Sequence, residues 1–266
     1  MTAIETPHDT TTSPDGTTIA YERRGAGRGL VLVHGGTADR SRWRTVAHLL
    51  EPHATVYAMD RRGRGGSGDA AQYAVGREYD DVAAVVRAAG DGADLLGHSF
   101  GGLCALEASL RAPGLRRLVL YEPPVVDDIL PPGLLARLER LLAEGEREEM
   151  LATFFREAVE MPEDELTMYR ALPAWQARIA AAHTLARELR VVNRYRFDPR
   201  RFAAMTVPTL LLLGGDSPAS MRASTWAVAE ALPDSRVVVL EGQQHIAMDT
   251  APGAFADAVV SFLREA

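Results

Sequence analysis

The stretch Asp94–Leu103, with the sequence DLLGHSFGGL, decides the fold, because a short apolar run leads into a small-residue turn and then into a helical pattern. Ser99 lies at the centre of a G-x-S-x-G pattern completed by Gly97 and Gly101. Such a pattern lets a strand reverse sharply into a helix and exposes the serine hydroxyl at the edge of a sheet. The glycines are required because a Cβ at either position would collide with neighbouring backbone.

The surroundings of this pattern agree with a strand–turn–helix unit. Residues 92–96 are typical of a buried strand, and Leu103, Leu106 and Leu110 follow at helical spacing until Pro113. The alternative, a Gly/Ser turn without chemistry, is disfavoured by this context.

Length and composition restrict the classes of protein. The 266 residues, 47% hydrophobic and 24% charged, allow one large α/β domain or two small ones. The net charge of −7 argues against a nucleic-acid partner. No apolar run approaches the roughly 20 residues that cross a bilayer. Residues 1–15 are polar and contain no signal-peptide core, so we expect a cytoplasmic protein without a membrane partner.

The scarcity of thiol and amine side chains excludes several kinds of site and reaction. Cys104 is the single cysteine, which rules out an intramolecular disulfide and a thiolate metal cluster, and it is predicted to pack as a small apolar residue. The chain contains no lysine, so Schiff-base and pyridoxal phosphate chemistry are excluded. The histidines lack paired ligand spacing. We therefore predict no metal and no cofactor.

A literal G-x-G-x-x-G pattern, Gly63, Gly65 and Gly68, follows the predicted strand 55–59. A dinucleotide fingerprint must open directly into a helix whose first turn faces the pyrophosphate. Here residues 69–76 are polar, and the helical pattern begins only near Arg77. We therefore interpret the segment as an ordinary loop.

Alternating strand and helix patterns predict an α/β fold with a mainly parallel, doubly wound sheet. Expected strands cover residues 17–24, 30–33, 55–59, 92–96, 115–121, 207–213 and 235–240, and a last helix covers 251–263. Between 123 and 206 the strand signals stop, and apolar stripes indicate three helices. We predict a core of residues 1–122 and 207–266, with a helical cap, 123–206, over the sheet edge where α/β proteins bind ligands.

A serine hydroxyl needs a base to remove its proton, and the base needs a third group to orient it. His245 lies in a loop just after the last expected strand, where an imidazole could reach the Ser99 edge of the sheet. Two carboxylates are candidates for the third group: Asp216, after strand 207–213, and Glu122, after strand 115–121. Either could orient an imidazole.

Five features together resemble the α/β-hydrolase superfamily across nearly the whole chain. They are the segments 34–36 (HGG), 60–67 and 97–102, Glu122 and the His245 loop. The resemblance implies an eight-stranded sheet with a cap inserted after the sixth strand. It also implies an oxyanion hole formed by the backbone N–H groups of Gly36 and Phe100. The residues expected to shape the substrate site are His34, Gly35, His98 and Glu122.

The acid is where the sequence departs from the commonest pattern of that superfamily. Most relatives place it after the seventh strand in a G-x-x-D run, and Asp216 lies one residue early. Some relatives, the haloalkane dehalogenases among them, place it after the sixth strand, the position of Glu122. We expect Asp216, with Glu122 as the alternative.

The resemblance implies a serine hydrolase that cleaves a small to medium, largely apolar ester, lactone or thioester through an acyl-enzyme on Ser99. A serine at the nucleophile position speaks against dehalogenase and epoxide hydrolase chemistry, and a perhydrolase activity would be a side reaction. The alternatives are a tailoring enzyme for cyclisation, acyl transfer or C–C cleavage, and a member that binds its ligand without turnover. The only expected partner is a small-molecule substrate, and the sequence does not indicate an oligomeric state.

Overall fold

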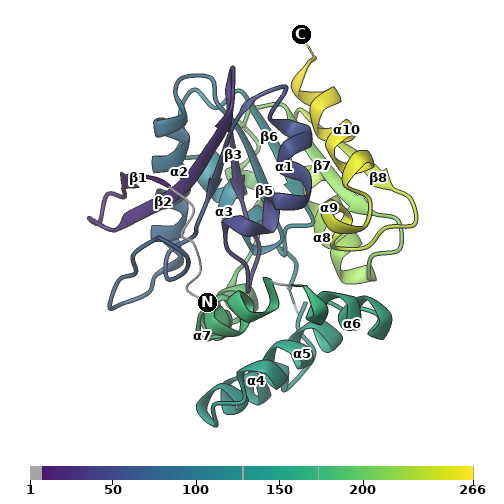
Figure 1. Cartoon of the computed structure of the whole chain (residues 1–266). Coiled ribbons are helices and arrows are strands. Elements are labelled where there is room, and N and C mark those ends of the chain that lie inside the picture. The colour runs from purple at the N-terminus through teal and green to yellow at the C-terminus, as the bar shows by residue number, and fades with distance from the viewer. Residues whose placement is uncertain (1–7, 128, 173, 266) are drawn as a thin grey trace.

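The computed structural model describes residues 8–127, 129–172 and 174–265, and within them eight strands form one sheet in the order β1-β2-β4-β3-β5-β6-β7-β8 (Figure 1). The first two pairings, β1–β2 and β2–β4, are antiparallel, and all others are parallel. The predicted mainly parallel sheet is confirmed. The strands are β1 Asp9–Thr12, β2 Thr18–Gly25, β3 Gly29–Val33, β4 Thr55–Met59, β5 Asp94–His98, β6 Arg117–Tyr121, β7 Thr209–Gly214 and β8 Ser235–Leu240.

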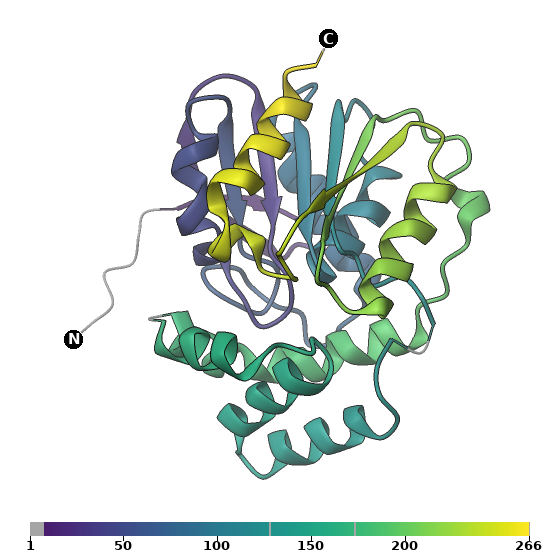
Figure 2. The ribbon, with the colours of Figure 1, turned by 90° about the vertical axis from the view of Figure 1, so that its right-hand side faces the viewer.

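Helices cover both faces of the sheet, as a doubly wound fold requires (Figures 1 and 2). One core, under α1 and α10, contains Trp43 and Phe255, and the other, under α2 and α3, contains Tyr79 and the buried Cys104. The core helices are α1 Arg44–Leu50, α2 Val75–Ala89, α3 Phe100–Ser109, α8 Ala219–Ala231, α9 Ala247–Thr250 and α10 Pro252–Leu263, with short 3-10 helices at Arg40–Trp43 and Pro199–Arg201.

The central parallel strands β3, β5 and β6 are buried along their whole length and mostly apolar, because both faces of the sheet are covered. Their registers bring the carboxyl ends together: Val33 pairs with both Met59 and Gly97, and His98 pairs with Tyr121. The loops that follow β3, β4, β5 and β6 therefore meet at one edge of the sheet, which is where α/β folds place their sites.

The helical insertion between β6 and β7 lies across this edge (Figures 1 and 2). Its described residues form four α-helices where the apolar stripes predicted three: α4 Leu134–Ala143, α5 Arg147–Glu157, α6 Glu163–Ala171 and α7 Ala174–Arg194. The additional helix is α6, whose nine residues bury only Leu166 and Tyr169, so its apolar stripe is too short to recognise. The exact cap boundaries, 123 and 206, stay a prediction.

Residues 1–7, part of the stretch interpreted as lacking a signal peptide, lie outside the described residues. None of the helices in the described ranges combines the length and the apolar character needed to span a membrane.

The glycine-rich loop after β4 folds around a carboxylate. The backbone N–H of Gly66 donates to Asp60 Oδ2 at 2.8 Å, and a Cβ on Gly65 (φ 55°) would lie 2.1 Å from the same oxygen. The next helix, α2, begins only at Val75. The geometry agrees with a structural loop and provides no helix N-terminus for a pyrophosphate.

The same loop carries a buried ion pair that fastens it to α2. Arg62 Nε and one terminal nitrogen donate to the two carboxylate oxygens of Asp81 at 2.6 and 2.7 Å, and both side chains are almost fully buried. Asp15, partly exposed, is a second partner of Arg62. A bidentate geometry suits arginine and offsets part of the cost of removing both charges from water.

We predict that Asp81→Asn lowers the free energy of unfolding by about 3 kcal/mol, because it leaves a buried guanidinium with only its partly exposed partner. The matched control is Asp80→Asn, which removes an exposed pair with Arg111 and should cost at most about 1 kcal/mol. Urea unfolding followed by circular dichroism measures both. Equal effects of the two substitutions would contradict the prediction.

Candidate active site

Ser99 occupies a strained turn between β5 and α3. Its φ and ψ are 55° and −127°, and its backbone N–H donates to the Tyr121 carbonyl at 2.8 Å. A Cβ on Gly101 would lie 2.3 Å from the carbonyl oxygen of His34, so only glycine allows the helix to approach β3 this closely. The strain costs about 1–3 kcal/mol and persists because the surrounding backbone fixes the turn. The result is the exposed-serine geometry that the sequence pattern indicates.

His245 contacts Glu122. Its Nδ1 lies 2.5 Å from Glu122 Oε2, and the carboxylate is completely buried. The other oxygen, Oε1, accepts hydrogen bonds from the backbone N–H of Gly214 at 2.7 Å and from the Ser217 hydroxyl at 2.6 Å. The carboxylate is thus fixed on both oxygens, and it determines which way the imidazole faces.

Asp216, the acid expected from the sequence, does not hold this position. It is exposed, and its backbone N–H donates to the Gln243 carbonyl at 2.9 Å. The loop after β7 still contributes to the site, through the Gly214 and Ser217 donors that fix Glu122. Since Nδ1 of His245 is engaged by Glu122, the geometry favours the alternative acid over the expected one.

Two aromatic side chains hold the loop that carries His245. His98 Nε2 lies 2.9 Å from the His245 carbonyl, and the Tyr121 hydroxyl donates to the Gln244 carbonyl and accepts from the Ala247 N–H at 3.2 Å. Burial lowers the pKa of His98 well below its ordinary value, so the ring is neutral and Nε2 carries the proton that it donates. Tyr121 was missed by the sequence analysis, although it directly precedes Glu122.

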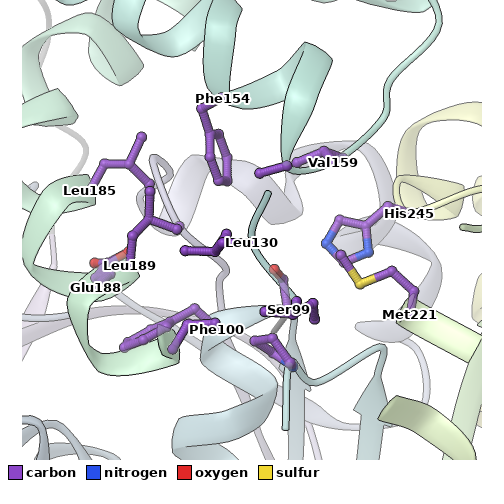
Figure 3. A pocket seen from close by; sticks show the side chains of 15 residues that line it. Ser99, Phe100, Leu130, Phe154, Val159, Leu185, Glu188, Leu189, Met221 and His245 are labelled. Carbon is purple, nitrogen blue, oxygen red and sulfur yellow. The ribbon is translucent and has the colours of Figure 1, made fainter. Parts of the chain in front are cut away.

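The pocket at Ser99 has two lobes, which share Gly36, Ser99, Phe154, Val159 and His245. The larger lobe, about 470 Å³, is lined almost entirely by apolar side chains (Figure 3). The smaller lobe, about 370 Å³, adds buried charged and polar groups. The further lining residues of the smaller lobe include Gly35, Ala38, Arg42, His98, Phe155, Tyr169, Arg178 and Ile246.

The cap supplies much of the larger lobe. Phe154 and Val159 come from α5 and the turn after it, and Leu185 and Leu189 come from α7. In Figure 3 the two leucines lie opposite His245, with Ser99 between them. The sequence predicted a helical cap over this edge of the sheet, but helical periodicity alone did not identify which of its residues line the pocket.

The expected oxyanion-hole residues, Gly36 and Phe100, both line the larger lobe beside Ser99. Phe100 is the first residue of α3, and the first N–H groups of a helix have no intrahelical acceptor. The loop that carries Gly36 is held by Arg61, whose guanidinium donates to the Gly35 carbonyl at 3.1 Å. Both residues therefore lie in the pocket at Ser99, and their role as an oxyanion hole stays a prediction.

His34, expected at the substrate site, is completely buried and does not line either lobe within the described part of the chain. Its Nδ1 lies 2.9 Å from the Gly35 carbonyl, and its Nε2 accepts from the Arg61 backbone N–H at 3.1 Å. Burial lowers its pKa well below the ordinary value, so the ring stays neutral. Its contacts give it a structural place in the loop. Gly35 and His98 do line the smaller lobe.

Comparisons with known proteins identify the family and the fold. Residues 30–258 match the family described as "Alpha/beta hydrolase family". The crystal structure of an alpha/beta hydrolase from Sphaerobacter thermophilus is 40% identical, covers 96% of this chain and 100% of that one, and superposes with a TM-score of 0.85.

Two curated relatives have named activities. The chain is 42% identical to an N-formylmaleamate deformylase of Pseudomonas putida over 105 residues, which span 38% of this chain and 39% of the relative. It is 27% identical to a pimeloyl-(acyl-carrier protein) methyl ester esterase of Aeromonas hydrophila over 92% of this chain and 99% of the relative.

Proposed function

The chain belongs to the alpha/beta hydrolase family, and from that premise we propose that it is a serine hydrolase that cleaves a small to medium ester through an acyl-enzyme on Ser99. The observation that carries the proposal is the contact between His245 Nδ1 and Glu122 Oε2, 2.5 Å long, in the same pocket as the strained Ser99 turn. A base oriented in this way beside an exposed serine is the arrangement that acyl transfer needs.

In the proposed mechanism, Ser99 Oγ attacks the ester carbonyl while His245 takes its proton on Nε2. The Glu122 carboxylate stabilises the imidazolium that forms. The Gly36 and Phe100 N–H groups stabilise the negative charge on the former carbonyl oxygen. His245 then gives the proton to the leaving alcohol, and the same steps with water release the acid and restore Ser99.

The pocket also refines the expectation of a largely apolar ester. The larger lobe suits an apolar chain. Within the described part of the chain, Arg178 of the smaller lobe donates only to uncharged oxygens: Thr37 Oγ1 at 3.1 Å, the Thr37 carbonyl and the Tyr169 hydroxyl at 2.5 Å. A buried guanidinium without a carboxylate partner favours a polar or anionic group in its neighbourhood. We therefore propose that the ester is apolar on one side of its carbonyl and polar on the other.

We predict that a fluorophosphonate probe adds one label to the wild type and none to Ser99→Ala, because only an activated serine attacks the phosphorus. Intact-mass spectrometry measures the label. Hydrolysis of p-nitrophenyl esters, neutral and ω-carboxylate, over a range of chain lengths measures turnover. Ser220→Ala, a serine substitution on α8, is the matched control and should label like the wild type.

A folded wild type that does not label would contradict the proposal and favour a ligand-binding member. Labelling without turnover of any ester would favour the tailoring alternatives.

We predict that Glu122→Gln lowers kcat by roughly 10⁴-fold with little change in KM, because the amide neither stabilises the imidazolium nor keeps its tautomer. Asp216→Asn, on the exposed residue two positions beyond Gly214, is the matched control and should leave kcat within about twofold of the wild type. Steady-state kinetics on one activated ester tests both. The opposite result would return the acid role to Asp216.

A further inference from the structure

Glu188 of α7 is a carboxylic side chain in a lobe that is lined mainly by apolar residues. It is almost completely buried, at 1% exposure, and lines the larger lobe together with Ser99. Figure 3 shows it beside Leu189, on the opposite side of Ser99 from His245. The proposed mechanism gives it no role. The remaining lining of this part of the lobe is apolar and includes Ile129, Leu130, Phe154, Leu185, Leu189 and Val192.

One carboxylate oxygen of Glu188 accepts hydrogen bonds from two arginines. Oε1 accepts from Arg61 at 2.9 Å and also from Arg64. Arg61 in turn forms a bidentate pair with Glu78, at 2.8 and 2.9 Å. Two guanidinium groups thus meet two carboxylates, so the charge of this buried cluster is balanced within the described residues.

The other oxygen, Oε2, is buried and has no hydrogen-bond partner among the residues that the structure describes. It faces the proposed oxyanion loop, since a Cβ on Gly36 would lie 3.2 Å from it. A buried carboxylate oxygen without a donor is costly, and such an atom calls for a partner that enters from the pocket.

We propose that Glu188 Oε2 is a specificity subsite that accepts a hydrogen bond from an uncharged donor, a hydroxyl or amide N–H, on the substrate close to its scissile carbonyl. The inference rests on the proposed function, because it places the donor on the group that Ser99 attacks. An uncharged donor fits because Arg61 and Arg64 already balance the charge. The closeness of Oε2 to Gly36 limits the donor to a position a few bonds from the carbonyl, as in a 3-hydroxyacyl ester.

The test uses Glu188→Gln, which replaces the hydrogen-bond acceptor of the subsite with a hydrogen-bond donor. The two arginines hold the Oε1 position with N–H donors, so the glutamine places its carbonyl oxygen there and turns its NH₂ group into the lobe. We compare kcat/KM for p-nitrophenyl 3-hydroxybutyrate and 3-methoxybutyrate, a donor and its methylated counterpart. The ratio of the two cancels any loss of active protein.

We expect the wild type to prefer the hydroxy ester, and Glu188→Gln to lower the hydroxy-to-methoxy ratio by tenfold or more, the size expected for a charge-assisted hydrogen bond. Glu139→Gln is the matched control: it is the same substitution in the cap, removes an exposed pair between α4 and Arg190 of α7, and should leave the ratio unchanged. A ratio that is the same in the wild type and in Glu188→Gln would overturn the proposal and assign Oε2 to a bound water. Fluorophosphonate labelling of each variant separates that outcome from failure of the proposed function, in which no variant labels.

Discussion

The active-site edge of this protein depends on one close backbone contact, the approach of the first turn of α3 to the ends of β3 and β5. A Cβ on Gly101 would lie 2.3 Å from the His34 carbonyl oxygen, and one on Gly97 would lie 2.5 Å from the Gly101 carbonyl oxygen. With no side chain at either position, the strand passes into the helix within one residue. Ser99 is that residue, and its positive φ places the hydroxyl above the sheet edge.

The position of the cap over this edge depends on a second feature, the buried side chain of Arg61. Arg61 contacts the Gly35 carbonyl in the loop that carries Gly36, Glu78 of α2 and Glu188 of the cap. Its guanidinium also lies 4.5 Å from the centre of the Phe100 ring. Buried charges of this kind add little net stability, because desolvation offsets their attraction. They do require each partner to be present at a fixed position. The cap and the loop that carries Gly36 are therefore fixed by the same side chain.

The sequence predicted the features whose signals are local. The turn at Ser99 depends on glycines within two residues of it, and the buried strands are continuous apolar runs. The acid could not be chosen in this way, because Glu122 and Asp216 both follow a strand, and only the packing of the β7 loop decides which carboxylate reaches His245. Glu188 was missed for a similar reason, since its partners are more than 100 residues away in the chain.

The larger lobe of the pocket implies two kinds of selectivity of different steepness, because it combines an apolar lining with the Glu188 carboxylate. In the apolar lobe, one methylene more or less changes transition-state binding by about 1–3 kcal/mol, so discrimination by chain length is gradual. A buried polar atom acts differently, because a substrate that offers it no partner leaves it desolvated and unpaired. Glu188 thus acts mainly by penalising the wrong substrate. The apolar lining tolerates many acyl or alkyl chains. One oxygen beside the Gly36 loop, without a hydrogen-bond partner among the described residues, is enough to select among them.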